Sequence, residues 1–248
     1  MRHRISVNDS VYIVVAPAYG DVVTNTAVLL VRGAWNGPEA WDAVLPELDG
    51  YDVRAIALPS SSRSPGAHPA GMYDDAEEIR RAIDEFDAPV TVVAHSYGGI
   101  PAAEAVSYCP AVARIVFLAS FVLYEGESMV SIAGGPKPHW DIDESAGLVR
   151  VRTPEQNIYA DLQGDIAAAA IKGLRPQSLR SLTEPLTSSA WKRVPSTYVR
   201  ASRDRAIPAA LTEVFTSRTD ALDLLDTGHA PCRVDPVGVA RLVRAAAA

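Results

Sequence analysis

Short apolar runs rich in β-branched residues alternate with longer segments of helical periodicity along most of the chain. The runs are VYIVVA (11–16), AVLLV (27–31), VRAIA (53–57), VTVVA (90–94), RIVFLA (114–119), STYVRA (196–201) and ALDLLD (221–226). Segments with helical patterns cover 38–48, 73–86, 97–108, 208–217 and 235–248. Several runs are apolar throughout, as strands of a parallel sheet are when both faces are covered. The alternation predicts an α/β fold built on a doubly wound, mostly parallel sheet.

One long segment breaks this alternation. Residues 123–192 show no good strand pattern, and their regular parts are short helical pieces such as NIYADL (157–162) and GDIAAAAIKGL (164–174). A long insertion between two strands is more often a lid or binding element than an idle loop. We therefore expect residues 1–122 and 193–248 to form the core and residues 123–192 to form a helical cap, or lid.

The composition is that of a folded, water-soluble domain. The chain has 248 residues, of which 48% are hydrophobic and 21% charged, and this length suits a single α/β domain. Its net charge is −7 and it has no basic run, which argues against nucleic acid and anionic membrane as partners. The partner that we expect is a small-molecule substrate, and a homodimer stays open.

The cysteines and the N-terminal residues bear on the compartment. Cys109 and Cys232 lack metal-ligand or disulfide-framework spacing, so we expect free thiols. The first residues loosely resemble a signal peptide that ends at Ala16-Pro17-Ala18, but Asn8 and Asp9 interrupt the pattern. We expect VYIVVA to be a strand and the protein to be cytoplasmic. No apolar stretch approaches the roughly 18 residues that a transmembrane helix needs.

Ser96 stands where the run VTVVA meets a helical segment. A serine on a sharp strand-to-helix turn needs small residues two positions before and after it, and Ala94 and Gly98 meet this need. Such a turn would lift the hydroxyl above the sheet as a nucleophile. The alternative is a serine that caps the following helix.

A serine nucleophile needs a base, and the base needs an acid that orients it. In folds with this turn the partners follow in the order Ser, Asp or Glu, His, each after a late strand. Asp204 follows STYVRA and His229 follows ALDLLD, so they are the best candidates. Asp226 and Asp235 have structural explanations, as a strand end and a helix cap. The other histidines, expected at the surface or in packing positions, are His3, His68, His139 and His95, the last pointing away from Ser96.

An oxyanion hole is the remaining requirement of this chemistry. One amide would come from the residue after the nucleophile, Tyr97, and one from the loop after an early strand. AVLLV runs into Arg32-Gly33-Ala34-Trp35, where Gly33 allows a tight turn and Ala34 can present its N–H.

Four segments together resemble the α/β-hydrolase superfamily: VRGAWNGPEAWDAVLPEL (31–48), VVAHSYGG (92–99), SRDRAIP (202–208) and GHAPCRVDP (228–236). The resemblance is strongest to the small esterase branch that includes plant methyl-ester esterases, hydroxynitrile lyases and bacterial relatives. It runs through almost the whole chain and is weakest in the insertion, which forms a cap in that family. It implies a Ser96-Asp204-His229 triad, an oxyanion hole from the Ala34 and Tyr97 amides, and no metal or organic cofactor.

Arg32 departs from the family pattern, because relatives commonly carry His-Gly where this chain has Arg32-Gly33. One interpretation is that its guanidinium receives an anionic or carbonyl-bearing substrate. The other is that it turns aside and pairs with an acid such as Asp42.

The resemblance leaves several reactions to weigh. A serine esterase or lactonase that works through an acyl-enzyme is the first hypothesis. Cyclisation or carbon–carbon cleavage on the same triad is an alternative, as is a non-catalytic binding protein. A hydroxynitrile lyase is disfavoured because Gly33 and Ala230 replace its threonine and lysine, and an aspartate-nucleophile enzyme is disfavoured by Ser96.

The substrate is expected to be small to medium in size and apolar or aromatic. Apolar residues of the insertion are numerous enough to cover such a group. The candidate substrate contacts are Arg32, Trp35, Trp140 and Tyr159.

Overall fold

The computed structural model describes residues 4–7, 11–14 and 26–248. The strand expected over 11–16 is present as β2 (Val11–Val14), which pairs antiparallel with β1 (Arg4–Val7). The rest of that run and the Ala16-Pro17-Ala18 motif lie outside the described residues.

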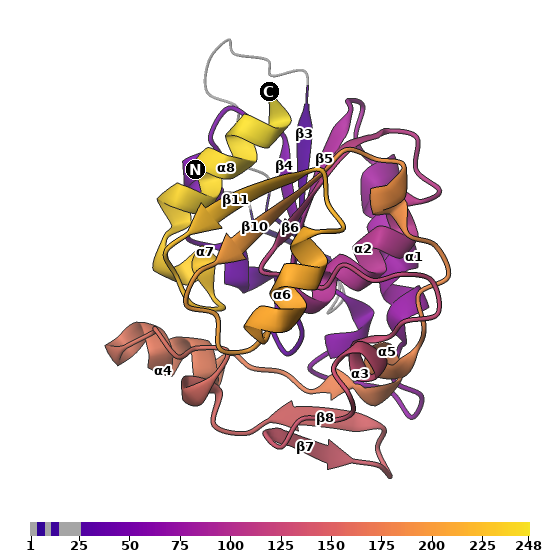
Figure 1. Cartoon of the computed structure of the whole chain (residues 1–248), viewed down its shortest axis with the longest axis vertical. Coiled ribbons are helices and arrows are strands. Elements are labelled where there is room, and N and C mark those ends of the chain that lie inside the picture. Colours follow the sequence, from indigo (N-terminus) through magenta and orange to yellow (C-terminus); the bar gives the residue numbers. More distant parts are fainter. Residues whose placement is uncertain (1–3, 8–10, 15–25) are drawn as a thin grey trace.

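A six-stranded sheet forms the centre of the molecule (Figure 1). Its strands are β3 (Ala27–Val31), β4 (Val53–Ile56), β5 (Val90–His95), β6 (Val112–Leu118), β10 (Ser196–Ala201) and β11 (Ala221–Leu225). They lie in the order β11-β10-β6-β5-β3-β4, and every pairing is parallel. The chain goes from β3 to β4 on one side and returns to β5 on the other. The direction of winding therefore reverses between β3 and β5, where such sheets form a crevice at the carboxyl ends of their strands.

Both faces of this sheet are covered, as the apolar runs predicted. In β3, Leu29 packs into one core with α1 (Met72–Asp84) and α2 (Gly99–Val106). Its neighbour Leu30 points into a second core with α8 (Pro236–Ala247). Figure 1 shows α8 on one side of the strands and α1 and α2 on the other. The doubly wound α/β fold is confirmed.

One expected helix is wrong. Residues 38–48 form two short 3-10 helices, η1 (Pro38–Trp41) and η2 (Leu45–Leu48). Pro46 has no N–H to donate and clashes with the preceding turn, so an α-helix cannot run through it. The other expected core helices are present as α1, α2, α6 (Ala209–Thr216) and α8.

The insertion contains strands, which the sequence pattern did not predict. A three-stranded antiparallel sheet joins β7 (Trp140–Asp143), β8 (Leu148–Val151) and β9 (Gln177–Ser178). These strands are too short, and β7 too rich in aspartate, to show a β-period. Three helices accompany them: α3 (Met129–Ile132), α4 (Gly164–Lys172) and α5 (Leu179–Thr183). Residues 157–162, expected to be helical, follow the 3-10 helix η5 (Pro154–Gln156) as turns instead.

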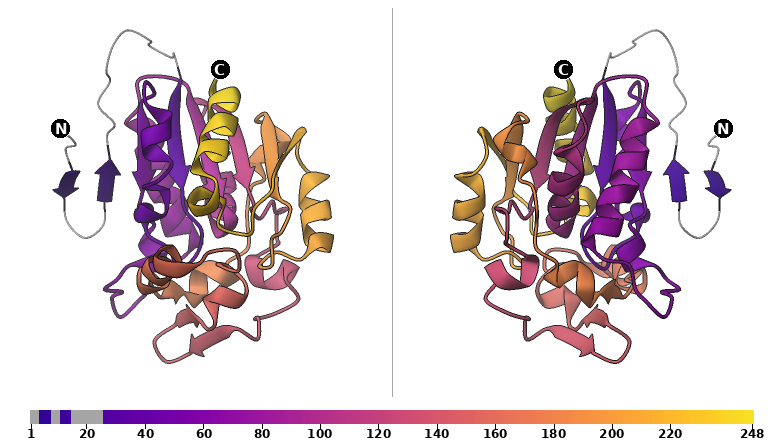
Figure 2. Two further views of the ribbon diagram at one scale, coloured as in Figure 1. Left: turned by 90° about the vertical axis from the view of Figure 1, so that its left-hand side faces the viewer. Right: turned by 90° about the vertical axis from the view of Figure 1, so that its right-hand side faces the viewer.

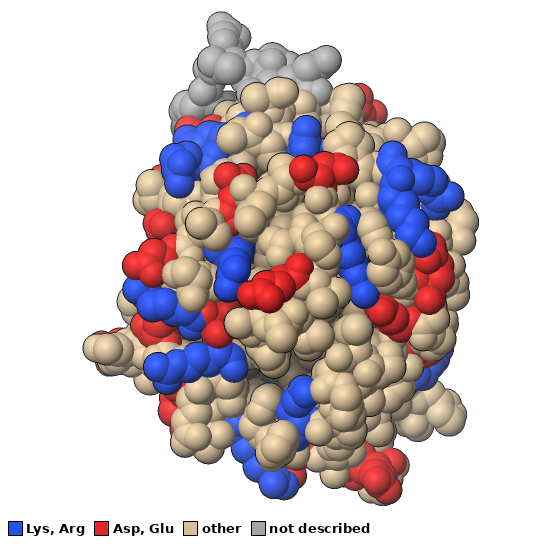
Figure 3. Space-filling view, viewed as in Figure 1, with Lys and Arg blue, Asp and Glu red and all other residues tan. Residues whose placement is uncertain are grey.

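The insertion lies against the carboxyl ends of the parallel strands (Figure 2). Within the described ranges, no helix combines the length and the apolar character needed to cross a bilayer. Acidic and basic side chains are interspersed on the face drawn in Figure 3.

Candidate active site

Ser96 occupies the turn between β5 and α2. Its φ angle is 53°, in the left-handed region that non-glycine residues rarely adopt. A Cβ on Gly98 would lie 2.4 Å from the Arg32 carbonyl oxygen, and Ala94 is fully buried. Both neighbours therefore have to be small. Strained backbone of this kind persists only where the surroundings hold it, and it is common at functional sites.

Ser120 holds this turn from the neighbouring strand. Its hydroxyl donates to the Ser96 carbonyl oxygen at 2.7 Å, and the Phe121 amide donates to the same oxygen at 3.2 Å. Tyr198 in turn donates to the Ser120 carbonyl at 3.1 Å. Ser120 stands two residues after the end of β6, and the sequence offered no signal for this role beyond that position.

The structure brings Ser96, His229 and Asp204 together in one row of hydrogen bonds. His229 Nε2 lies 2.9 Å from Ser96 Oγ, and His229 Nδ1 lies 2.8 Å from Asp204 Oδ2. A carboxylate can only accept, so Nδ1 carries the ring proton and Nε2 is free to accept from the serine hydroxyl. Ser96 is 6% exposed and His229 5% exposed, so the row is almost closed to water.

Asp204 is held in its ionised form. Burial by itself would raise the pKa of this carboxyl group. The charge of His229 and hydrogen bonds from that ring and from the amides of Ile207 and Ala206 outweigh burial, and the pKa lies below its usual value. The two amides donate to Oδ1 at 3.0 and 2.7 Å. The carboxylate can therefore hold and stabilise a protonated His229.

The loops that carry Asp204 and His229 are tied to each other. The Arg203 amide donates to the Thr227 carbonyl at 2.9 Å, and its guanidinium pairs with Asp226 at 2.9 Å. Asp235 accepts from the Gly238 amide at the start of α8. Asp226 and Asp235 thus have the structural roles that we expected.

His95 differs from its expected role. Its Nε2 donates to the His229 carbonyl at 2.7 Å, its ring centre lies 5.1 Å from that of His229, and the ring lines the pocket beside Ser96. Burial lowers its pKa to about 3, and the neighbouring His229 adds to this shift. His95 is therefore a neutral donor that fixes the main chain of the His229 loop. His3 lies outside the described residues.

The loop after β3 lies directly against the nucleophile. A Cβ on Gly33 would be 2.9 Å from Ser96 Cβ and 3.0 Å from His95 Nδ1, so only glycine fits there. The next amide, that of Ala34, has no hydrogen-bond partner among the described residues. The amide of Tyr97 lies in the first turn of a helical segment, where no intrahelical acceptor is available. Both amides are suited to bind an anionic oxygen.

The insertion holds this loop at Trp35. The backbone of Trp35 is left-handed, with φ 60°. Its amide donates to Gln177 Oε1 at 3.3 Å and its carbonyl accepts from the Arg175 amide at 2.8 Å. Its indole N–H donates to the Val149 carbonyl at 3.0 Å. The conformation of the loop after β3 (Arg32 to Trp35), called the oxyanion loop below, therefore depends on residues outside the core.

Gln177 extends this contact into a buried polar network. Its Nε2 donates to Ser60 Oγ at 2.7 Å, and Ser60 and the Tyr97 hydroxyl both donate to Asp75. Burial raises the pKa of Asp75 to about 6, although these hydrogen bonds and the charge of Arg32 oppose the rise. Asp75 and Gln177 were not predicted as site residues, because an acid in the first turn of a helix and a polar residue of the insertion both have ordinary explanations.

Arg32 contradicts the substrate-binding interpretation and turns aside from the pockets, as the other interpretation expected. It is fully buried and donates to the carbonyls of Gly33 and Leu58, each at 2.9 Å. It does not line either pocket at the site, and the carboxylates whose charges reach it are those of Asp75 and Glu39. Burial lowers its pKa to about 10. Arg32 therefore braces the oxyanion loop from beneath instead of touching a substrate.

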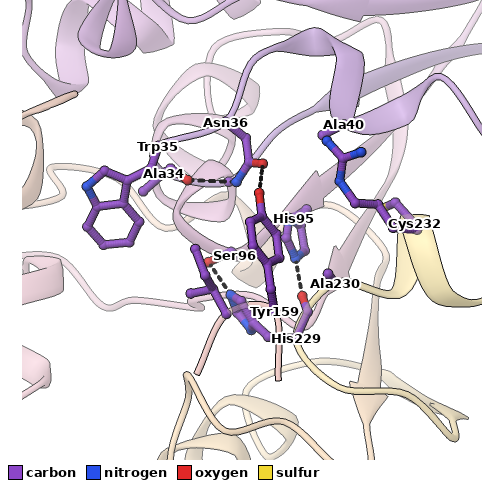
Figure 4. A pocket seen from close by; sticks show the side chains of 13 residues that line it. Ala34, Trp35, Asn36, Ala40, His95, Ser96, Tyr159, His229, Ala230 and Cys232 are labelled. Atoms are coloured by element: carbon purple, nitrogen blue, oxygen red, sulfur yellow. Dashed lines mark hydrogen bonds between the residues drawn. The ribbon is translucent and has the colours of Figure 1, made fainter. Parts of the chain in front are cut away.

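Two pockets meet at Ser96 and His229. The first is lined by the oxyanion loop, Asn36, Tyr159 and Arg233, among others (Figure 4). The second is mostly apolar, lined by residues that include Phe121, Met129, Trp140, Ile207 and Leu211. Trp35 and Ile158 line both. Of the four candidate substrate contacts, Trp35, Trp140 and Tyr159 border these pockets and Arg32 does not.

Comparison with known proteins identifies the family. A model of the alpha/beta hydrolase family matches residues 28–242. The chain is 29% identical over 243 residues to the alpha/beta hydrolase nvfD of Aspergillus novofumigatus (strain IBT 16806), covering 89% of this chain and 96% of that one.

Two solved structures share the fold. A pyrethroid hydrolase from Sphingobium faniae JZ-2 superposes with a TM-score of 0.75 at 19% identity, over 90% of this chain and 97% of that one. The methylesterase MES16 from Arabidopsis superposes with a TM-score of 0.73 at 20% identity, over 89% of this chain and 98% of that one. The strand order, the turn at Ser96 and the family match lead to one conclusion. The chain belongs to the alpha/beta hydrolase family.

Proposed function

We propose that this protein is a serine hydrolase that cleaves a carboxylic ester or lactone through an acyl-enzyme. The observation that carries the proposal is the hydrogen-bonded row of Ser96, His229 and Asp204, with steps of 2.9 and 2.8 Å. The names of the pyrethroid hydrolase and the methylesterase that share its fold support ester chemistry.

In the first half of the reaction Ser96 attacks the substrate carbonyl as His229 Nε2 takes the hydroxyl proton. The amides of Ala34 and Tyr97 bind the oxyanion, each contributing about 3 to 4 kcal/mol in the transition state. His229 then gives its proton to the departing alkoxide, which leaves the acyl group on Ser96. A water molecule, deprotonated by the same nitrogen, hydrolyses this ester and restores the serine.

The apolar pocket supports a substrate with an apolar or aromatic part of small to medium size. Cytoplasmic residence stays a prediction, which the free, buried cysteines Cys109 and Cys232 support. A small-molecule partner and the open question of a homodimer also stay at the level of prediction.

Covalent labelling by a fluorophosphonate tests the proposal. We expect the protein to be labelled stoichiometrically at Ser96 and to hydrolyse short 4-nitrophenyl esters. Ser96→Ala should abolish both, because it removes the nucleophile and leaves the pocket almost unchanged. A native protein that neither reacts with the probe nor cleaves any short acyl ester would overturn the proposal and favour a binding protein.

A further inference from the structure

The charges around the nucleophile contrast with those of the chain as a whole. The sequence has 30 acidic and 23 basic residues, excluding histidine. Yet the residues that line the two pockets include no aspartate or glutamate, and their charged members are Arg233 in the first pocket and Lys137 in the second. In this acidic protein, the charged residues that line the two pockets are therefore cations.

Arg233 lies close to the reacting groups along the chain and in space. It belongs to α7 (Pro231–Val234), which begins two residues after His229, and it is half-buried. It also lies near Tyr159: burial raises the pKa of this hydroxyl to about 12, and the positive charge of Arg233 and a hydrogen bond with its side chain oppose that rise. Tyr159 itself donates to Asn36 Oδ1 at 2.7 Å, so these side chains form a polar end to the first pocket (Figure 4).

The carboxylates around this end of the pocket have other partners. Glu39 pairs with Arg175 at 2.8 Å and with Arg63 at 3.5 Å. Asp161 accepts from the Gly228 amide, and Asp204 is bound to His229. Within the part of the chain that the structure describes, Arg233 forms no ion pair. Its half-buried guanidinium has several N–H donors, so a hydrogen bond to Tyr159 leaves others for solvent or for a ligand.

Lys137 is a weaker candidate for the same task. Its Nζ donates to the Ala133 carbonyl within the insertion, and the pocket around it is mostly apolar. An arginine also presents a rigid fork of donors that matches a carboxylate in two parallel hydrogen bonds, whereas a lysine offers a point charge.

We infer that Arg233 binds a carboxylate of the substrate. The substrate class would then be an ester or lactone that carries a free carboxylate, with its apolar part in the pocket of Phe121 and Trp140. This inference rests on the proposed function, since it concerns the substrate of the same Ser96 site. It makes Arg233 a residue that determines specificity.

Two matched pairs of esters test the inference on either side of the scissile bond. In the first pair, mono-4-nitrophenyl glutarate is compared with the neutral 4-nitrophenyl glutaramate. In the second, 3-carboxyphenyl butyrate is compared with 3-carbamoylphenyl butyrate. Each pair differs only in carboxylate against amide, so the ratio of kcat/KM within a pair isolates the charge.

The native protein should prefer the carboxylate member of at least one pair by about tenfold or more, as expected for a charged hydrogen bond. Arg233→Met should lower that ratio by about tenfold, and Arg233→Lys should retain part of it. Arg244→Leu is the matched control, because it removes an exposed cation from α8 and should leave the ratio unchanged. The native preference should also decline as salt is raised.

The outcomes separate the inference from the function. Hydrolysis of the neutral esters without a carboxylate preference, or with a preference that Arg233→Met and Arg233→Lys both leave intact, overturns the inference and keeps the serine hydrolase. Absence of both labelling and hydrolysis overturns the proposed function itself. If Arg233→Met fails to fold, Arg233→Lys and the salt dependence of the native ratio decide between the same outcomes.

Discussion

The two halves of the candidate site are held largely by different parts of the molecule. Ser96, Asp204 and His229 follow core strands, and their loops are tied mainly by bonds from other core residues such as Ser120 and Arg203. The insertion adds one bond to this half, from the Gly228 amide to Asp161. The oxyanion loop also follows a core strand, but its Trp35 is fixed by the insertion through bonds with Gln177, Arg175 and Val149.

This difference separates two requirements of catalysis. In the proposed mechanism the sheet determines where Ser96 and His229 stand, because each follows a strand of fixed register. The insertion determines how the oxyanion donors are presented, while it also forms much of the apolar pocket. Changes in the insertion should therefore affect turnover as well as substrate choice.

The largest effects should come from the half that the core holds. His229→Ala should lower kcat by a factor on the order of 10⁵ to 10⁶, since it removes the base, and Asp204→Asn by about 10⁴. Steady-state hydrolysis of a 4-nitrophenyl ester measures both. Asp223→Asn, at an exposed position on β11, is the matched control and should retain activity. Full activity in Asp204→Asn would mean that another acid orients His229.

A smaller loss should come from the half that the insertion holds. Gln177→Leu removes the acceptor of the Trp35 amide and should lower kcat about ten- to a hundredfold, because displaced oxyanion donors lose part of their contribution. KM should change little. The split between kcat and KM, measured on one ester, identifies a positioning role.

Thr183→Ala provides the comparison for that variant, since it is exposed on the adjacent α5 and bonds only within its helix. Thermal unfolding of both variants shows whether they remain folded at the assay temperature. If Gln177→Leu lowers kcat no more than Thr183→Ala does, the insertion does not position the oxyanion loop.

The smallest effects concern the pH dependence of the free energy of unfolding. The contributions of His95, beside the triad, and of Asp75, in the network of Gln177, should have opposite signs. The pKa of His95 lies at about 3, so below pH 6.5 the unfolded chain binds a proton that the native state refuses. The free energy of unfolding therefore decreases as the pH is lowered, by up to about 1.4 kcal/mol per pH unit. Native Asp75 instead keeps its proton up to about pH 6, above its usual 3.8, so its contribution falls as pH rises between those values.

Urea unfolding at pH 4.5 and 6.5 tests this contrast. His95→Gln keeps a donor for the His229 carbonyl and should reduce the loss of unfolding free energy at the lower pH. Asp75→Asn should increase that loss, because it removes the contribution to unfolding free energy that grows as the pH is lowered. His68→Gln alters an exposed histidine and should leave the difference as in the native protein. Equal pH dependence in all four proteins would refute the assignment of these two groups.

Much of the fold could be predicted because the central strands β3 and β5 are fully buried. The run AVLLV is apolar at every position and VTVVA at every position but Thr91, and the residues after them stand at one edge of the sheet. This edge brings Ser96 together with Asp204 and His229, both of which follow it by more than a hundred positions in the sequence. Order along the chain and position after a strand were sufficient to select them.

The rest depends on contacts that no local pattern records. Arg32 and Asp75 are polar residues buried by their neighbours, and only the packed structure reveals that they face the same network. The strands of the insertion are stabilised by pairing with each other rather than by their own periodicity. At residues 38–48 the helical spacing of apolar residues was visible, but Pro46 outweighed it.

The edge-on contact between Trp35 and Trp140 has a practical consequence. Their ring centres lie 5.8 Å apart, and both rings border the apolar pocket. The other tryptophans are Trp41, buried in the core on the α8 face of the sheet, and Trp191, whose indole donates to Leu123. A ligand that enters the pocket would therefore change the emission of one indole pair against a constant background, so the protein carries its own fluorescent reporter of occupancy.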